Sequence, residues 1–116
     1  MTISKLLELA FTSIASLLLM IGVASADLIK EIQDRGVLKV GMAESPPWQS
    51  PNPLSGIYEG FNVDLAERAA DLMGVKLEVV PATWSTLIPG LSAKQYDVVF
   101  ANLFATPKRA LVVNFT

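Results

Sequence analysis

Short apolar runs rich in β-branched residues recur along residues 27–116, and these runs predict strands. They are separated by segments whose apolar residues follow a helical period, so strand and helix are expected to alternate. Alternation of this kind is typical of a parallel α/β sheet with right-handed crossovers. The predicted strands are Val37–Ala43, Val75–Val80, Tyr96–Ala101 and Leu111–Phe115.

The helical segments are predicted from apolar spacing and from residues that start or end helices. Asp27–Arg35 and Trp84–Ala93 each carry an apolar face, and Thr106–Ala110 predicts a short helical turn. The longest helix is expected between Asp27–Arg35 and Trp84–Ala93, with Asn62 as its cap and Gly74 as its stop. Its predicted buried face consists of Phe61, Leu65, Ala69 and Leu72.

Three loops follow the first three predicted strands and carry most of the residues with binding chemistry. They comprise residues 43–60, 81–85 and 102–108. Residues 44–56 contain four prolines, which predicts a loop without a regular β ladder. Because ligands of open parallel sheets bind beyond the carboxyl ends of the strands, the three loops are expected to form one crevice.

Residues 1–26 have the features of a signal peptide. Lys5 precedes an apolar run from Leu9 to Val23, and Ala24-Ser25-Ala26 matches the small-x-small pattern that signal peptidase accepts. The alternative is an uncleaved membrane anchor, for which this run is short compared with the roughly 20 residues of a span. We therefore expect residues 1–26 to be removed and residues 27–116 to be exported, with no membrane-spanning segment after cleavage.

Composition excludes several classes of site and partner. The chain has no cysteine, so packing and not disulfides is expected to stabilise it, and the cysteine of a bacterial lipid anchor is lacking. An exported protein without that anchor is expected in a periplasm. A net charge of -2 without a basic run indicates no nucleic-acid partner. The absence of histidine argues against a His-ligated metal and a Ser-His or Cys-His triad, and no cofactor is predicted.

The segment ATPKRALVVNFT places two cations directly after a predicted helix start. Thr106 is the expected N-cap and Pro107 the first helical residue, and Lys108 and Arg109 follow. A helix start carries partial positive charge, so cations at this place indicate an anionic partner.

Four segments, taken in order, resemble one part of a known family. They are LKVGMAESPPW, GFNVDLAERAADLMG, WSTLIPGLSAKQYDVVFANL and TPKRALVVNFT, and they resemble the first half of the first lobe of periplasmic solute-binding proteins of the polar amino acid type. The resemblance implies part of lobe 1 of a two-lobe, type II periplasmic-binding-protein-like fold. It also implies a binder rather than an enzyme, which delivers its solute to an ABC permease in the inner membrane.

Six residues are predicted to bind the ligand, four of them from the resemblance. Arg109 matches the family's arginine that grips the ligand's α-carboxylate, which would be the anion expected beside the two cations. Trp84 matches an aromatic residue that covers the ligand's side chain, and Asn102 lies where the family often has Ser or Gly facing the ligand. Trp48 lies in a segment that resembles the family's aromatic-bearing first loop. Ser45 and Thr106 are predicted to bind the ligand because they lie in the loops of the expected crevice, although many relatives have an aromatic residue at the position of Ser45.

Some positions depart from the family's pattern. Phe104 stands where a Ser or Thr usually binds the carboxylate, and Ala43 stands where binders of basic amino acids have an acid. These departures weigh against an ordinary polar amino acid and against lysine or arginine. Asp64 and Asp97 are predicted to be structural residues.

Two alternatives to the binder stay open. Residues 58–68, YEGFNVDLAER, also resemble periplasmic cyclohexadienyl dehydratases, which would make the protein a lyase on the same fold. The second alternative is a nonfunctional truncated product, because relatives continue into a second lobe. With half of the cleft missing, residues 27–116 are expected to bind amino acids no better than roughly millimolar, about 4 kcal/mol, and to melt with low cooperativity.

Overall fold

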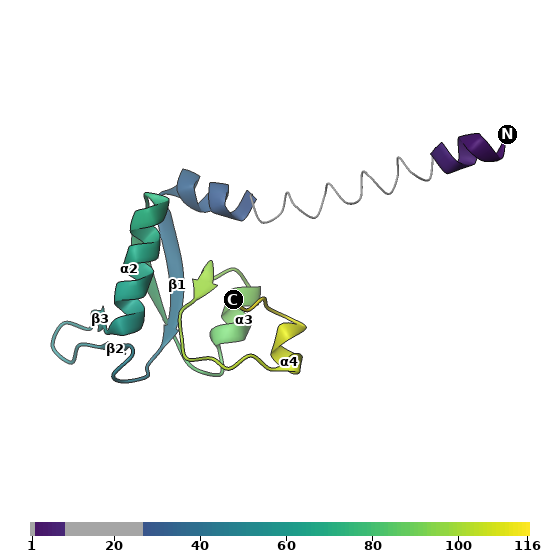
Figure 1. The fold of residues 1–116 in the computed structure, drawn as a ribbon. Helices are drawn as coiled ribbons and strands as arrows, with labels where there is room; N and C mark the ends of the chain where they lie inside the picture. Colours follow the sequence, from purple (N-terminus) through teal and green to yellow (C-terminus); the bar gives the residue numbers. More distant parts are fainter. Residues whose placement is uncertain (1, 9–26) are drawn as a thin grey trace.

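The computed structural model describes residues 2–8 and 27–116 (Figure 1). Residues 3–8 and 27–35 are helical, and the second of these helices confirms the one predicted over Asp27–Arg35. Most of the predicted signal peptide, including its cleavage site, lies outside the described residues. Within the described ranges, no helix combines the length and the apolar character required to cross a membrane.

A three-stranded parallel sheet organises the domain. β1 (Val37–Ala43) lies in the middle, between β4 (Lys76–Ala82) and β5 (Val98–Val99). β1 pairs with β4 along its whole length but with β5 only through Val40 and Gly41. The prediction of a parallel α/β sheet is therefore confirmed.

Two helices cover this sheet. In Figure 1, α2 (Phe61–Met73) lies on one side of β1 and α3 (Leu87–Ser92) on the other. The strand order β4-β1-β5 explains this, because right-handed crossovers that run in opposite directions place their helices on opposite faces. Seven buried residues form the core on the α2 side: Ile32, Leu38, Val40, Met42, Val63, Ala66 and Ala70.

The predicted buried face of α2 is wrong at three of its four residues, and only Ala69 packs, partly buried, against the core. Phe61 is 61% exposed, Leu65 48% and Leu72 74%, whereas Ala66 and Ala70 are buried. The helix carries two adjacent apolar stripes, and the stripe of smaller side chains contacts the sheet because it permits a closer approach of the helix axis. Asn62 is also not the cap: it is buried within α2, and the N-cap residue is Gly60.

The ends of α2 follow from glycine conformations. Gly74 adopts a left-handed conformation with φ of 72°, which confirms it as the predicted stop. At the other end, Gly60 has φ of 123°, a region that side chains rarely adopt, and a Cβ here would lie 2.4 Å from the carbonyl oxygen of Trp48. A glycine is therefore required at Gly60 by conformation and by space.

Several predicted boundaries differ from the structure. α3 begins at Leu87 because residues 84–86 form a turn before it, and β5 is only two residues long. The proline-rich loop contains one short antiparallel ladder, formed by β2 (Ser50–Pro51) and β3 (Tyr58–Glu59). The prediction of no ladder there is wrong, since a proline that lacks an N–H is tolerated in a short edge strand.

The predicted last strand, Leu111–Phe115, is not a strand. α4 (Pro107–Ala110) confirms the helical turn, but residues 111–116 form a turn and irregular backbone. β-branched composition produces a strand only where an edge is available for pairing, and in the described part of the chain this segment pairs with none. Val112, Val113 and Phe115 instead line a cavity of about 460 Å³ beside β5 and α3.

Tyr96 sets the distance between α3 and β1. Its hydroxyl oxygen lies 2.6 Å from the carbonyl oxygen of Leu87, to which it donates. An added Cβ would lie 2.6 Å from this ring at Gly41 and 2.3 Å from the hydroxyl oxygen at Gly90, so both glycines make room for the side chain. Burial raises the pKa of Tyr96, and the hydroxyl therefore stays protonated and remains a donor at neutral pH.

Asp97 ties the helix at residues 27–35 to the sheet. Its carboxylate forms an ion pair with Arg35 and accepts a hydrogen bond of 2.9 Å from the backbone N–H of Lys39. Arg35 also donates to the carbonyl oxygen of Val37 at 2.9 Å. These contacts support the structural role predicted for Asp97.

Candidate functional site

The strand order locates the expected ligand edge. The chain leaves β1 toward β4 and later returns to β5 on the opposite side of β1, so the topological switch point lies between β1 and β5. Ligands of open α/β sheets bind at this point, beyond the carboxyl ends of the strands. The loops concerned begin at Glu44, Thr83 and Phe100.

The loop after β1 is held in place by a buried polar chain. The Gln49 side chain, which is completely buried, donates to the carbonyl oxygen of Ala43 at 2.9 Å. Asn62 of α2 donates to the Gln49 side-chain oxygen at 2.6 Å, and its backbone N–H donates to the carbonyl oxygen of Trp48 at 3.0 Å. This loop is thereby fixed against the first turn of α2.

Sequence reasoning missed the role of Gln49. A glutamine in a proline-rich, polar loop carries no signal that distinguishes a buried network residue from a solvated one. The signal that could have indicated it is the tertiary approach of Asn62, which the sequence does not show.

Trp48 and Trp84 both project from loops at the carboxyl edge and remain about half exposed. Trp84 donates its indole N–H to the carbonyl oxygen of Glu44 at 3.2 Å, which joins the loop after β4 to the loop after β1. Trp48 contacts Phe61 edge-on, with ring centroids 6.3 Å apart and planes at 79°. Ser45, in the first loop, donates its backbone N–H to the carbonyl oxygen of Gln49 at 2.7 Å.

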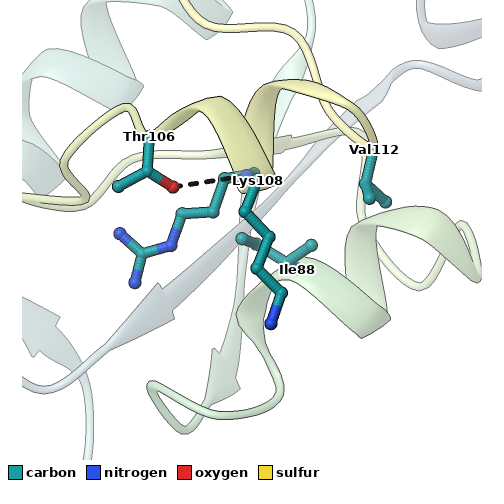
Figure 2. A pocket seen from close by; sticks show the side chains of 5 residues that line it. Ile88, Thr106, Lys108 and Val112 are labelled. Carbon is teal, nitrogen blue, oxygen red and sulfur yellow. Dashed lines mark hydrogen bonds between the residues drawn. The ribbon is translucent and has the colours of Figure 1, made fainter.

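Arg109 is oriented by its own loop. The Thr106 hydroxyl accepts a hydrogen bond of 3.3 Å from the backbone N–H of Arg109, which confirms Thr106 as the N-cap of α4 (Figure 2). The Arg109 guanidinium donates through Nη1 to the carbonyl oxygen of Phe104 at 2.8 Å. Position 104 thus contributes its backbone carbonyl to Arg109, while its phenyl ring is exposed.

A cavity of about 470 Å³ lies beside α4, and we call it the α4 cavity. It is lined by Ile88, Thr106, Lys108, Arg109 and Val112. Figure 2 shows the Lys108 side chain extending from α4 past Ile88 of α3. Two residues of this lining, Ile88 and Val112, are apolar, and the other three come from the first turn of α4 and its cap.

The structure gathers the six expected ligand-binding residues only in part. Thr106 and Arg109 share the α4 cavity, whereas the other four do not line it. Trp84 and the loop that carries Ser45 and Trp48 are joined through Glu44. Asn102 is exposed in the segment between β5 and α4.

The ion pairs among the described residues involve the helix at residues 27–35 and not α4. The described ion pairs are Lys30–Asp34, Arg35–Glu31 and Arg35–Asp97, and none involves Lys108 or Arg109. At the first loop, burial and then the Glu44 carboxylate raise the pKa of Tyr58, which keeps this phenol neutral. Among residues 2–8 and 27–116, no group of acidic side chains could hold a metal ion.

Comparison with known families decides the class of protein. The family described as bacterial extracellular solute-binding proteins, family 3, matches residues 38–116. The chain belongs to this family. The resemblance of its four segments is therefore confirmed, and so is the fold as a partial α/β lobe of this class.

Relatives in this solute-binding family include binders and an enzyme. The octopine-binding periplasmic protein of Rhizobium meliloti is 41% identical over 70 residues, which cover 60% of this chain and 24% of that protein. A cyclohexadienyl dehydratase of Pseudomonas aeruginosa is 31% identical over 80 residues, which cover 69% of this chain and 30% of the enzyme. The chain thus spans about a quarter to a third of the length of these curated relatives.

The match to one solved structure covers a larger share of the relative's length. The arginine-bound form of domain 1 from TmArgBP superimposes with a TM-score of 0.69 at 40% identity, covering 74% of this chain and 68% of that one. The described residues therefore correspond to a large part of one domain of a solute-binding protein.

Proposed function

We propose that this chain forms one wall of an extracytoplasmic binding site for a small amino-acid-like or carboxylate-bearing solute, which is delivered to an ABC importer in the inner membrane. The observation that carries the proposal is the α4 cavity, in which Arg109 is oriented by the carbonyl of Phe104. A guanidinium held in this way offers its remaining N–H groups to a carboxylate as a planar fork.

The other ligand-binding residues act around this anchor. Thr106 lines the same cavity, and its hydroxyl can add a polar contact to the carboxylate. Trp84 and Trp48, each about half exposed, supply aromatic surface for the ligand's side chain, and Ser45 and Asn102 supply polar groups at the same edge. The opposite wall belongs to a second lobe, and no cofactor or nucleic acid takes part.

An NMR titration of the isotopically labelled chain tests this function. Alanine, octopine and arginine are added, and alaninamide serves as the matched compound that lacks the carboxylate. We expect the carboxylates to shift the backbone amide signals of residues 106–112 with a dissociation constant of roughly 1 mM, about 4 kcal/mol, and alaninamide to leave them unchanged. Absence of shifts with every carboxylate, or equal shifts with alaninamide, would contradict the proposal.

We expect this part of the protein to bind its solute with low affinity, and this affinity can be measured. Domain 1 from TmArgBP has been solved in an arginine-bound form, so a single domain of that relative can hold a ligand. In this chain, the α4 cavity is open to water that competes for Arg109, which favours millimolar affinity. The same titration measures this affinity directly.

A dehydratase is the second candidate function, because a cyclohexadienyl dehydratase is among the relatives. The two functions differ in what happens to the bound solute. Incubation with prephenate or arogenate yields an aromatic product if the chain is a lyase, and binding without turnover supports the binder. A truncated product without function would show neither.

Export is expected to precede binding. The periplasmic location of the octopine-binding relative supports a periplasmic location here, reached through removal of residues 1–26. Mass spectrometry of a periplasmic extract should find a mature N-terminus at Asp27. Recovery of the full-length chain in the membrane fraction would contradict cleavage and support an anchor.

A further inference from the structure

We infer that Gln49 is a positioning residue that holds Trp48 and Trp84 in one arrangement at the ligand edge. This inference rests on the proposed function, in which both tryptophans contact the side chain of the solute. Gln49 lies out of reach of a solute, because its own side chain is completely buried. It acts through its hydrogen bonds to Ala43 and Asn62.

The Gln49 amide uses its donor and its acceptor in different directions. Its Nε2 donates to the carbonyl oxygen of Ala43, the last residue of β1, at 2.9 Å. Its Oε1 accepts a hydrogen bond of 2.6 Å from Nδ2 of Asn62 in α2, a residue that is only 8% exposed. Gln49 therefore joins the end of the central strand to the first turn of a helix, at a buried place where water does not replace a lost hydrogen bond.

The backbone of the first loop is closed around this amide. Ser45 donates its backbone N–H to the carbonyl oxygen of Gln49, and its own carbonyl oxygen accepts the N–H of Trp48 at 2.8 Å. The Trp48 carbonyl oxygen accepts the backbone N–H of Asn62 at 3.0 Å. Both backbone polar groups of Trp48 are thus engaged within the unit that Gln49 holds together.

Trp84 is linked to the same loop through its side chain. Its indole N–H donates to the carbonyl oxygen of Glu44 at 3.2 Å. Glu44 directly follows Ala43, whose carbonyl is held by Gln49, so a change in the Gln49 contact moves the acceptor of the indole. The turn at residues 83–86 has hydrogen bonds of its own, between backbone groups and through threonine hydroxyls. Loss of the Gln49 amide is therefore expected to release the Trp84 indole without unfolding this turn.

Two tryptophans that are held before the solute arrives favour its binding. Trp48 is 47% exposed and Trp84 46%, so each combines a held edge with free aromatic surface. Side chains that are already ordered lose less entropy on binding. Gln49 is thus expected to raise the affinity for solutes whose side chains contact the tryptophans. It should leave the carboxylate contact of Arg109 unchanged, because Arg109 is oriented by its own loop.

The indole N–H signals test the positioning directly. The chain has two tryptophans, so a nitrogen-labelled sample gives one signal for Trp48 and one for Trp84. Gln49→Met keeps an unbranched side chain of similar length but removes the amide. Both signals should shift, and the Trp84 N–H should exchange with water about tenfold faster, the change for a lost hydrogen bond of about 1.4 kcal/mol. Unshifted signals, with the fold retained by circular dichroism, would overturn the inference.

Gln49→Glu keeps the size of the side chain and makes the positioning depend on pH. When protonated, the introduced carboxyl can donate to Ala43 and accept from Asn62, as the amide does. When ionised, it places a buried negative charge against the Ala43 carbonyl. Burial raises the pKa of such a carboxyl above about 4.3, so the tryptophan emission should match that of the unaltered chain at about pH 4 and depart from it as the pH rises toward about 9.

Gln95→Glu makes the same chemical change at an exposed position and is the matched control. Its emission should follow that of the unaltered chain at every pH. The carboxylates of Glu44, Glu59 and Asp64, on the neighbouring loop, strand and helix, titrate in all these chains and cancel in the comparison. The pH series also decides the matter if Gln49→Met does not fold. Emission of Gln49→Glu that never departs from the unaltered chain, or departs equally in Gln95→Glu, would overturn the inference.

Phenylalanine and alanine connect the positioning to binding, because they differ by one phenyl ring. In NMR titrations, the unaltered chain should bind phenylalanine about fivefold more tightly than alanine, the change for about 1 kcal/mol of aromatic contact. Gln49→Met should bring the two affinities within about twofold of each other and leave that for alanine unchanged.

The outcomes separate this inference from the function on which it rests. Equal losses for phenylalanine and alanine in Gln49→Met would show a general effect on the fold and overturn the inference. Equal affinities in the unaltered chain would overturn the role of the tryptophans, and the inference with it. Binding of neither solute would overturn the proposed function, whereas the indole signals would still decide whether Gln49 positions Trp48 and Trp84.

Discussion

Replacement of Arg109 by alanine is expected to weaken carboxylate binding by about 2 kcal/mol or more, as when one partner of a hydrogen-bonded charge pair is removed. The Phe104 carbonyl and the Thr106 hydroxyl hold Arg109 in place before the ligand arrives, so little ordering of this side chain is required on binding. For a chain with roughly millimolar affinity, this loss removes measurable binding. The measurement is the NMR titration with alanine, in which the shifts of residues 106–112 should disappear.

Two variants make this result specific. Arg109→Lys should recover only part of the affinity, because an ammonium cannot offer the planar fork of a guanidinium. Arg68→Ala removes the same charge from the exposed surface of α2 and should leave binding unchanged. Unaltered affinity in Arg109→Ala, with the fold retained by circular dichroism, would contradict the carboxylate role.

Gly60→Ala is expected to lower the free energy of unfolding by about 3 kcal/mol or more, through backbone strain together with overlap. The added Cβ would lie 2.4 Å from the carbonyl oxygen of Trp48 and 3.0 Å from that of Pro47. Both are backbone atoms that cannot rotate away. The Trp48 carbonyl also accepts the backbone N–H of Asn62, so its displacement disturbs the first turn of α2. Urea unfolding followed by tryptophan fluorescence measures the loss.

Gly56→Ala is the matched control for this substitution. Gly56 also has a positive φ, 71°, but an added Cβ meets no atom within 4 Å. Gly56→Ala should lower the free energy of unfolding by only about 1 to 2 kcal/mol, the cost of a side chain in the left-handed conformation. Equal destabilisation by the two substitutions would show that the close approach of Trp48 to Gly60 contributes nothing.

Local sequence patterns were sufficient to predict the elements whose boundaries depend on neighbouring residues in the chain. β1 was predicted with its exact bounds because seven consecutive residues of strand composition lie between a helix end and a proline-rich loop. The end of α2 at Gly74 and the cap of α4 at Thr106 were predicted because each depends on backbone chemistry within one turn. Arg109 was singled out for the same reason, since it follows this cap directly.

Other features depend on what packs nearby, and the sequence could not predict them. α2 carries two apolar stripes, and helical periodicity does not indicate that the sheet contacts Ala66 and Ala70 while Phe61 and Leu65 stay exposed. The composition of Leu111–Phe115 favours a strand, but no edge among the described residues pairs with it. Gln49 became identifiable as a network residue only through its contacts with Ala43 and Asn62.

By itself, the sequence determined the alternation of strand and helix, the family of the protein, and two adjacent cations after a helix cap. These properties reside in short segments, because propensity, capping and turn chemistry act over a few residues. Only the tertiary structure decided that Lys108 and Arg109 share a cavity with Ile88, which comes from α3, and that Asp97 is engaged by Arg35. The reason is physical: charge compensation and cavity shape depend on side chains that are distant in the sequence and that only the packing of α3, α4 and the sheet brings together.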